Sequence, residues 1–202
     1  MLYMANPLSA AEFSRQSGSG TSWIVGGSSS ENLCIEGHDH RSLDEAPPGP
    51  ALDIARRIDA ALDGAILPAS ESDNTLGRVV LVECDSFDEN LPSKRTLLDA
   101  LGMKRTIRDR INLHDEATLE NVNLENKDVW LGFEDDQITQ EQPEEDDSDV
   151  VKAKRVTDIM VADLTGHFEL NFSENIVCAP VLYGGRASGG NIVCVLSMRV
   201  WT

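Results

Sequence analysis

The stretch 175–202, NIVCAPVLYGGRASGGNIVCVLSMRVWT, holds two nearly unbroken apolar runs that are separated by a glycine-rich loop. Runs of this length, rich in Val, Ile and Leu, are typical of β-strands, and the loop predicts a hairpin. Because both faces of each run are apolar, we expect the hairpin to be covered on both sides. Cys178 and Cys194 are equally far from Arg186, so a turn centred there predicts that they lie opposite one another, as packed thiols or as a disulfide.

The sequence before this hairpin contains further helix and strand signals. Pro50 opens an amphipathic helix that we expect to stop at Gly64, because apolar residues recur there at steps of three and four. The run RVVLVECD, residues 78–85, predicts a buried strand. Ser93 is expected to cap a second helix that ends at Gly102. The predicted fold is therefore α+β, a mainly antiparallel β-sheet with two or three helices and a long extended N-terminal arm.

Two stretches contain weaker patterns. Alternating apolar residues at 122–124 and 129–133 predict a hairpin around the polar ENKD. The stretch 150–172 is interpreted as strands that precede the closing hairpin, although residues 156–164 also fit a helix.

The N-terminal and acidic segments differ from the rest in composition. Residues 1–49 are rich in Ser, Gly and Pro, and such a segment cannot bury enough apolar surface to offset its ordering entropy, so it must dock on a partner or stay mobile. The stretch 134–149 contains nine acidic residues and no basic one, which is typical of a solvated loop; a docking tail or a cation buffer is the alternative. The predicted divisions are an extended N-terminal arm 1–49, an α/β part of the body 50–133, an acidic loop or linker 134–149, and a β-rich C-terminal part of the same body 150–202.

The charge of the chain excludes several classes of partner. Thirty-five acidic residues against seventeen basic ones give a net charge of -18 over 202 residues. Nucleic acid and anionic membranes attract basic proteins, so we expect no direct nucleic-acid binding and no membrane binding. The sequence has neither a membrane-spanning apolar run nor a secretion signal, which predicts a soluble protein that is cytoplasmic when made, or a component of a virion.

One short motif has metal-ligand chemistry. If CIEGHDH, residues 34–40, is extended, Cys34, Glu36, His38 and His40 share one face and form a candidate site for zinc or another transition metal. A polar turn with solvent-facing histidines is the alternative. Asp85, Asp88 and Glu89, after the apolar run RVVLV at 78–82, are a second candidate, for Mg²⁺, against a solvated acidic turn. No catalytic residue and no cofactor are predicted.

The closing strands resemble those of GAF domains, in which an N-I-x-C-x-P-[VIL] strand leads through a turn into a G-V-L-S strand. Cys194 stands where that family has glycine, and no terminal helix follows. The resemblance implies a small-molecule-binding regulatory module. The matching residues are Asn175, Ile176, Cys178, Pro180, Val181, Val195, Leu196 and Ser197.

Three functions are compatible with these patterns. The first is a non-catalytic structural subunit of a larger homo- or hetero-oligomer, for instance a virion capsid, neck or tail component. Such a subunit would bind neighbouring copies through its arm and sheet, and its partners would be protein subunits of the same assembly. The second is the GAF-like sensor, and the third is a metal-dependent enzyme that uses the CIEGHDH segment.

Overall fold

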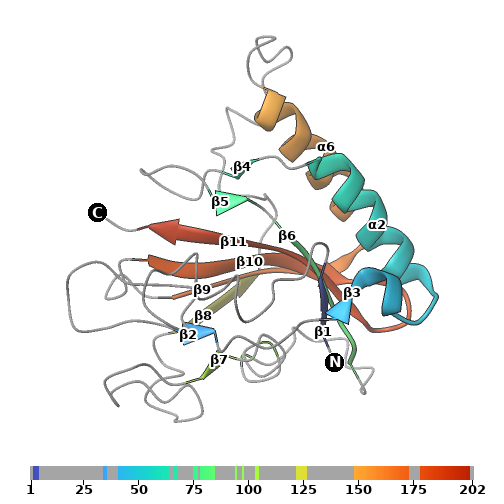
Figure 1. Cartoon of the computed structure of the whole chain (residues 1–202), viewed down its shortest axis with the longest axis horizontal. Helices are drawn as coiled ribbons and strands as arrows, with labels where there is room; N and C mark the ends of the chain where they lie inside the picture. Colours follow the sequence, from blue (N-terminus) through green and yellow to red (C-terminus); the bar gives the residue numbers. More distant parts are fainter. Residues whose placement is uncertain are drawn as a thin grey trace.

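A computed structural model gives the fold of the chain (Figure 1). It describes residues 2–4, 34–35, 41–63, 66–67, 75–76, 78–84, 94, 97, 103–104, 122–126, 148–172 and 178–200. In chain order, the elements are β1 (Leu2–Met4), β2 (Cys34–Ile35), β3 (Arg41–Ser42), the 3-10 helix η1 (Leu43–Glu45), α2 (Pro50–Leu62), β4 (Ile66–Leu67), β5 (Thr75–Leu76), β6 (Arg78–Val82), β7 (Met103–Lys104), β8 (Val122–Asn126), α6 (Ser148–Asp163), β9 (Thr165–Phe172), β10 (Cys178–Arg186) and β11 (Ile192–Val200).

The main sheet has seven strands in the order β3-β1-β6-β11-β10-β9-β8. Neighbouring strands are antiparallel except β1 and β3, which are parallel. Two small antiparallel sheets, β2–β7 and β4–β5, lie outside it. The predicted α+β class, with a mainly antiparallel sheet and two helices, is confirmed. The predicted arm 1–49 lies largely outside the described residues.

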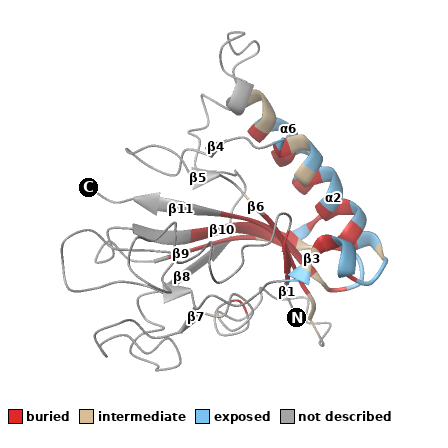
Figure 2. Cartoon of the chain, viewed as in Figure 1, coloured by how far each residue is buried: buried red, intermediate tan, exposed pale blue. Residues whose placement is uncertain are grey.

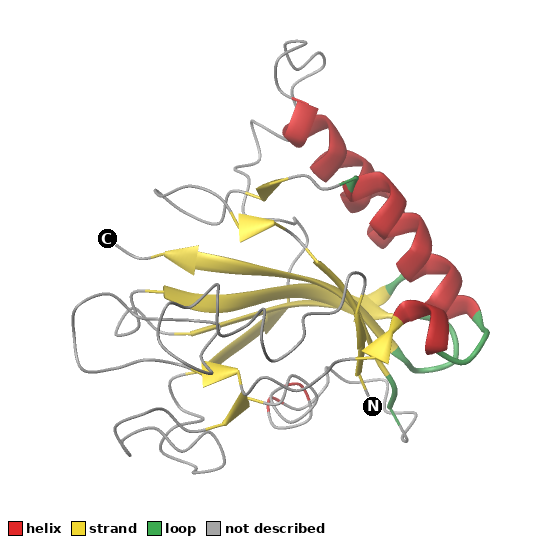
Figure 3. Cartoon of the chain, viewed as in Figure 1, coloured by secondary structure: helices red, strands yellow, loops and turns green. Residues whose placement is uncertain are grey.

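The two helices α2 and α6 pack together on one face of the sheet (Figure 3). Their buried residues face the strands, whereas their exposed residues face away from the sheet (Figure 2). Among the described residues, no helix is long and apolar enough to span a membrane. The core between helices and sheet includes Leu52, Ala55, Ile58, Leu62, Val156, Met160, Val181, Tyr183, Val193 and Val195.

Helix α2 begins at Pro50 as predicted, because a proline at the first helical position has no amide that needs a partner. It ends one residue earlier than predicted. Asp63, at φ 43° and ψ 47°, takes the left-handed position, and its backbone N–H donates to the carbonyl of Asp59. The predicted second helix is described at Lys94 and Leu97 alone, and both of these residues are helical.

Helix α6 decides between the two interpretations of 150–164, because the stretch is a helix up to Asp163 and not a strand. Ala153, Val156, Met160 and Leu164 are all buried, at steps of three and four residues that place them on one side of a helix. The helix begins at Ser148, within the predicted acidic segment 134–149.

The closing hairpin is confirmed, but its predicted register is wrong. Cys178 pairs with Val200, and Cys194 pairs with Gly184, so the two cysteines are not opposite one another. The turn lies later than expected, at Ala187–Asn191, where the N–H of Ala187 donates to the carbonyl of Asn191 at 2.9 Å. Cys194 is a free thiol, which excludes the disulfide.

The register shifts because two glycines of the GGRASGG loop lie inside strand β10. A Cβ atom on Gly184 would be 2.8 Å from Cβ of Cys194 and 2.8 Å from the carbonyl oxygen of Val193. A Cβ atom on Gly185 would be 2.9 Å from Cβ of Leu164. These glycines allow close packing rather than the turn. Consecutive residues Ile192 to Leu196 are all buried, so the hairpin is covered on both faces as predicted.

Candidate functional site

The predicted metal site is only partly described. Cys34 lies in β2 and pairs with Lys104 of β7. Glu36, His38 and His40 lie outside the described residues. Within the described ranges, no three His, Cys, Asp or Glu side chains come together as a metal site. The site of Cys34, Glu36, His38 and His40 therefore stays a prediction.

The predicted carboxylate cluster follows a strand that is confirmed. Strand β6 ends at Val82 and is buried from Val79 onward. Asp85, Asp88 and Glu89 lie outside the described residues, so the magnesium site is also untested.

The N-terminal strand β1 enters the main sheet, which the sequence did not lead us to expect. It lies between β3 and β6, where Tyr3 pairs with Arg41 on one side and with Leu81 on the other. Tyr3 and Met4 are 4% and 1% exposed, and the Tyr3 hydroxyl donates to Oε2 of Glu83 at 3.3 Å. The apolar start of the chain was the available signal, but the polar residues that follow it led to its assignment to the arm.

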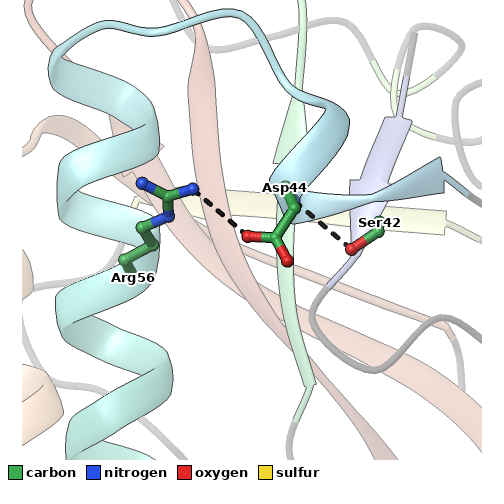
Figure 4. A network of polar contacts seen from close by, with 3 residues as sticks. All are labelled: Ser42, Asp44 and Arg56. Atoms are coloured by element: carbon green, nitrogen blue, oxygen red, sulfur yellow. Dashed lines mark hydrogen bonds and ion pairs between the residues drawn. The ribbon is translucent and has the colours of Figure 1, made fainter.

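The far end of the predicted arm is also fixed to the fold. Ser42 caps η1 through a capping box, because its hydroxyl accepts from the N–H of Asp44 and its N–H donates to the carboxylate of Glu45. Asp44 in turn accepts from Arg56 of α2 at 3.2 Å (Figure 4). Leu43 and Ala46 are buried in the core. Residues 2–4 and 41–46 therefore hold both ends of the segment 5–40 at neighbouring strands, and within that segment Cys34–Ile35 pair with β7.

A polar pair is buried on strand β9. Glu169 is 2% exposed, and Nδ2 of Asn171 donates to its Oε1 at 2.6 Å. Glu169 pairs in register with Tyr183 of β10 and with Glu125 of β8. The alternation in HFELNF suggests solvent exposure for these polar residues, so sequence reasoning missed the pair.

Two cysteines have described side chains, Cys84 and Cys194, and both are free thiols. Burial raises the pKa of Cys194 well above its ordinary range, with a smaller contribution from nearby Cys84. The Cys84 thiol is half-buried and has a weak contact with the carbonyl of Val82 at 3.9 Å, while its N–H donates to Oδ1 of Asn191. A thiol that stays protonated is a poor nucleophile, so Cys194 is a packing residue.

The charge is unevenly divided along the chain. The described residues contain eleven acidic and eleven basic residues, which is a net charge of zero. The other 24 acidic and 6 basic residues carry the whole of -18. The charge that dominates the composition is therefore absent from the described part of the sheet and helices.

No family model matches the sequence, and no curated protein matches it. These comparisons therefore add nothing to the resemblance of the closing strands to GAF domains.

Proposed function

We propose that the chain is a non-catalytic structural subunit of a larger oligomer, in which it binds copies of itself through its N-terminal segment and its sheet. The observation that carries this proposal is the anchoring of the segment 5–40 at both ends. Strand β1 and residues 41–46 are parts of the fold. The composition between them is too polar and too rich in Ser and Gly to build a core of its own. A long segment held this way is suited to docking on a neighbouring subunit.

The division of charge supports the same proposal. The described residues of the sheet and helices are neutral in sum, so they add no net repulsion toward a second copy, whereas a charge of -18 among them would. The assembly would form in the cytoplasm or be part of a virion.

A mass measurement tests the proposal. Size-exclusion chromatography with light scattering compares the full chain with a variant that lacks residues 8–31. This deletion leaves about a dozen residues between β1 and β3, enough for a crossover between parallel strands. A deletion of 1–48 is unsuitable, because it removes Tyr3, Met4, Leu43 and Ala46 from the core.

We expect the full chain to form oligomers larger than its monomer of 22.1 kDa and the shortened variant to be a folded monomer. A full-length chain that stays monomeric at high concentration would overturn self-assembly. A shortened variant that keeps the full oligomer mass would remove the N-terminal segment from the proposal and leave the sheet as the contact.

The GAF-like sensor is a second candidate. It is favoured by one feature, the adjacency of β10 and β11, which are the strands that carry the resemblance. This candidate predicts a monomer or dimer that binds a small molecule in a closed apolar pocket. Thermal-shift screening of a metabolite collection against the full chain would detect such a ligand as a rise in Tm.

A further inference from the structure

We propose that β1 is exchanged between copies of the chain, so that Leu2–Met4 of one copy occupies the position between β3 and β6 of a second copy. This inference rests on the proposed function and names the contact that joins the subunits. It starts from two properties of β1: the strand has only three residues, and its Tyr3 and Met4 side chains are nevertheless buried.

Strand β1 has one buried side chain on each face of the sheet. Tyr3 joins the core under the helices together with its register partner Leu81, and its hydroxyl reaches Glu83. Met4, the next residue, points to the opposite face and pairs with Val80, which is also fully buried. A strand that lies between β3 and β6 is therefore held by two buried side chains, by the hydrogen bond from Tyr3 to Glu83, and by pairing with a strand on each side.

None of these contacts depends on which copy supplies the strand. The partners of β1 include β3, η1, β6 and Glu83, and the next described element after β1 is β2 at Cys34. Residues 5–33 connect the two, and 12 of these 29 residues are Ser or Gly. A connection of this length can extend to roughly 95 Å at about 3.3 Å per residue. A compact chain of this size has a radius of gyration of only about 16 Å, so β1 can reach the sheet of a neighbour.

Exchange of such an element costs little. The same pairings form within one copy and between two, so the exchanged arrangement loses no contact and gains whatever the two subunits share elsewhere. A three-residue strand has few hydrogen bonds to break, which favours release from its own sheet.

Engineered disulfides between register partners test the proposal. Cα partners in antiparallel strands are roughly 4.5–5.5 Å apart, within the range that a disulfide spans. One variant carries Met4→Cys, a second carries Val80→Cys, and a third carries both. All three have alanine at the four native cysteine positions, and this background is first shown to keep the oligomer mass of the native chain. The first two variants are co-expressed, purified as a mixed oligomer and oxidised.

Exchange predicts a covalent dimer of the two single variants on a non-reducing gel. The double variant is the matched control, because it crosslinks wherever β1 is docked. A mixed oligomer that stays monomeric on the gel, beside a double variant that crosslinks within one chain, overturns exchange and leaves assembly intact. A double variant that crosslinks neither within nor between chains overturns the proposal as well, because β1 then lies elsewhere.

Discussion

The described sheet and helices differ sharply from the rest of the chain in charge. The described residues contain equal numbers of acidic and basic side chains, and the remaining residues carry the whole net charge of -18. The described part is held together by apolar side chains between helices and strands, with Thr157, Glu169 and Asn171 as its buried polar residues. The difference separates two kinds of substitution. Changes at the buried residues of the described part should act on stability through packing, and we expect changes of charge in the acidic stretch 134–147 to act on association.

The largest effect is expected at the helix–sheet core. Ile58 of α2 is fully buried, so Ile58→Ala should lower the free energy of unfolding by about 2–5 kcal/mol. Val161 of α6 is 54% exposed, and Val161→Ala is the matched control, with an expected change within about 0.5 kcal/mol. Urea unfolding measures both. Equal losses in the two variants would contradict the placement of α2 and α6 on the sheet.

A smaller loss in the free energy of unfolding is expected where strands β10 and β11 lie closest together. Gly184→Ala places a methyl group 2.8 Å from a side-chain carbon and from a backbone oxygen, so the strands must shift at a cost of about 1–3 kcal/mol. Gly49→Ala is the control, because a Cβ atom there meets nothing within 4 Å. If the two variants unfold at the same urea concentration, the register of the hairpin is wrong.

The buried thiol should make stability fall at alkaline pH. The pKa of Cys194 is raised in the folded state, so the unfolded chain loses this proton first and stability declines as pH rises above about 9.0, the ordinary pKa of the thiol. The decline attributable to this group is at most about 1.4 kcal/mol per pH unit. The Cys194→Ala variant should lack that part of the slope between pH 9 and 10.5. Identical slopes would show that the thiol is not buried.

The smallest effect on stability is expected from the acidic stretch. Replacing the acids of 134–147 by their amides should change the free energy of unfolding by less than about 1 kcal/mol at 0.15 M salt, because the charges of a solvated loop, which the sequence predicts here, are screened and weakly coupled. A variant in which Asp and Glu are interchanged in the same stretch is the control. A loss of several kcal/mol would mean that these charges have partners in the folded core.

The sequence was sufficient where periodicity and local geometry agree. Helix α2 has a proline at its start and an apolar stripe on one side, and both signals are local. Helix α6 was left undecided between helix and strand because its apolar residues Val156, Ile159 and Met160 include β-branched ones, which are also typical of strands. The packing of Leu164 and Val156 on the sheet is a tertiary effect that outweighs this local preference.

The register of the hairpin and the polar pair of β9 depend on contacts between distant residues. Position 184 lies in a strand and is glycine because Cys194 and Phe168 leave no room for a side chain, which no loop pattern reveals. Glu169 and Asn171 alternate as solvent-facing residues do, and only the neighbouring strands bury them. Likewise, β1 has three residues, too few for a period, and its role follows from pairing with β6.

The mass of the full-length chain in solution, measured by light scattering across a concentration series and beside the variant lacking 8–31, decides whether the chain assembles with itself. Self-assembly through the N-terminal segment predicts a defined multiple of 22.1 kDa for the full chain and a single folded subunit for the variant. A full chain that remains one subunit at every concentration would contradict it.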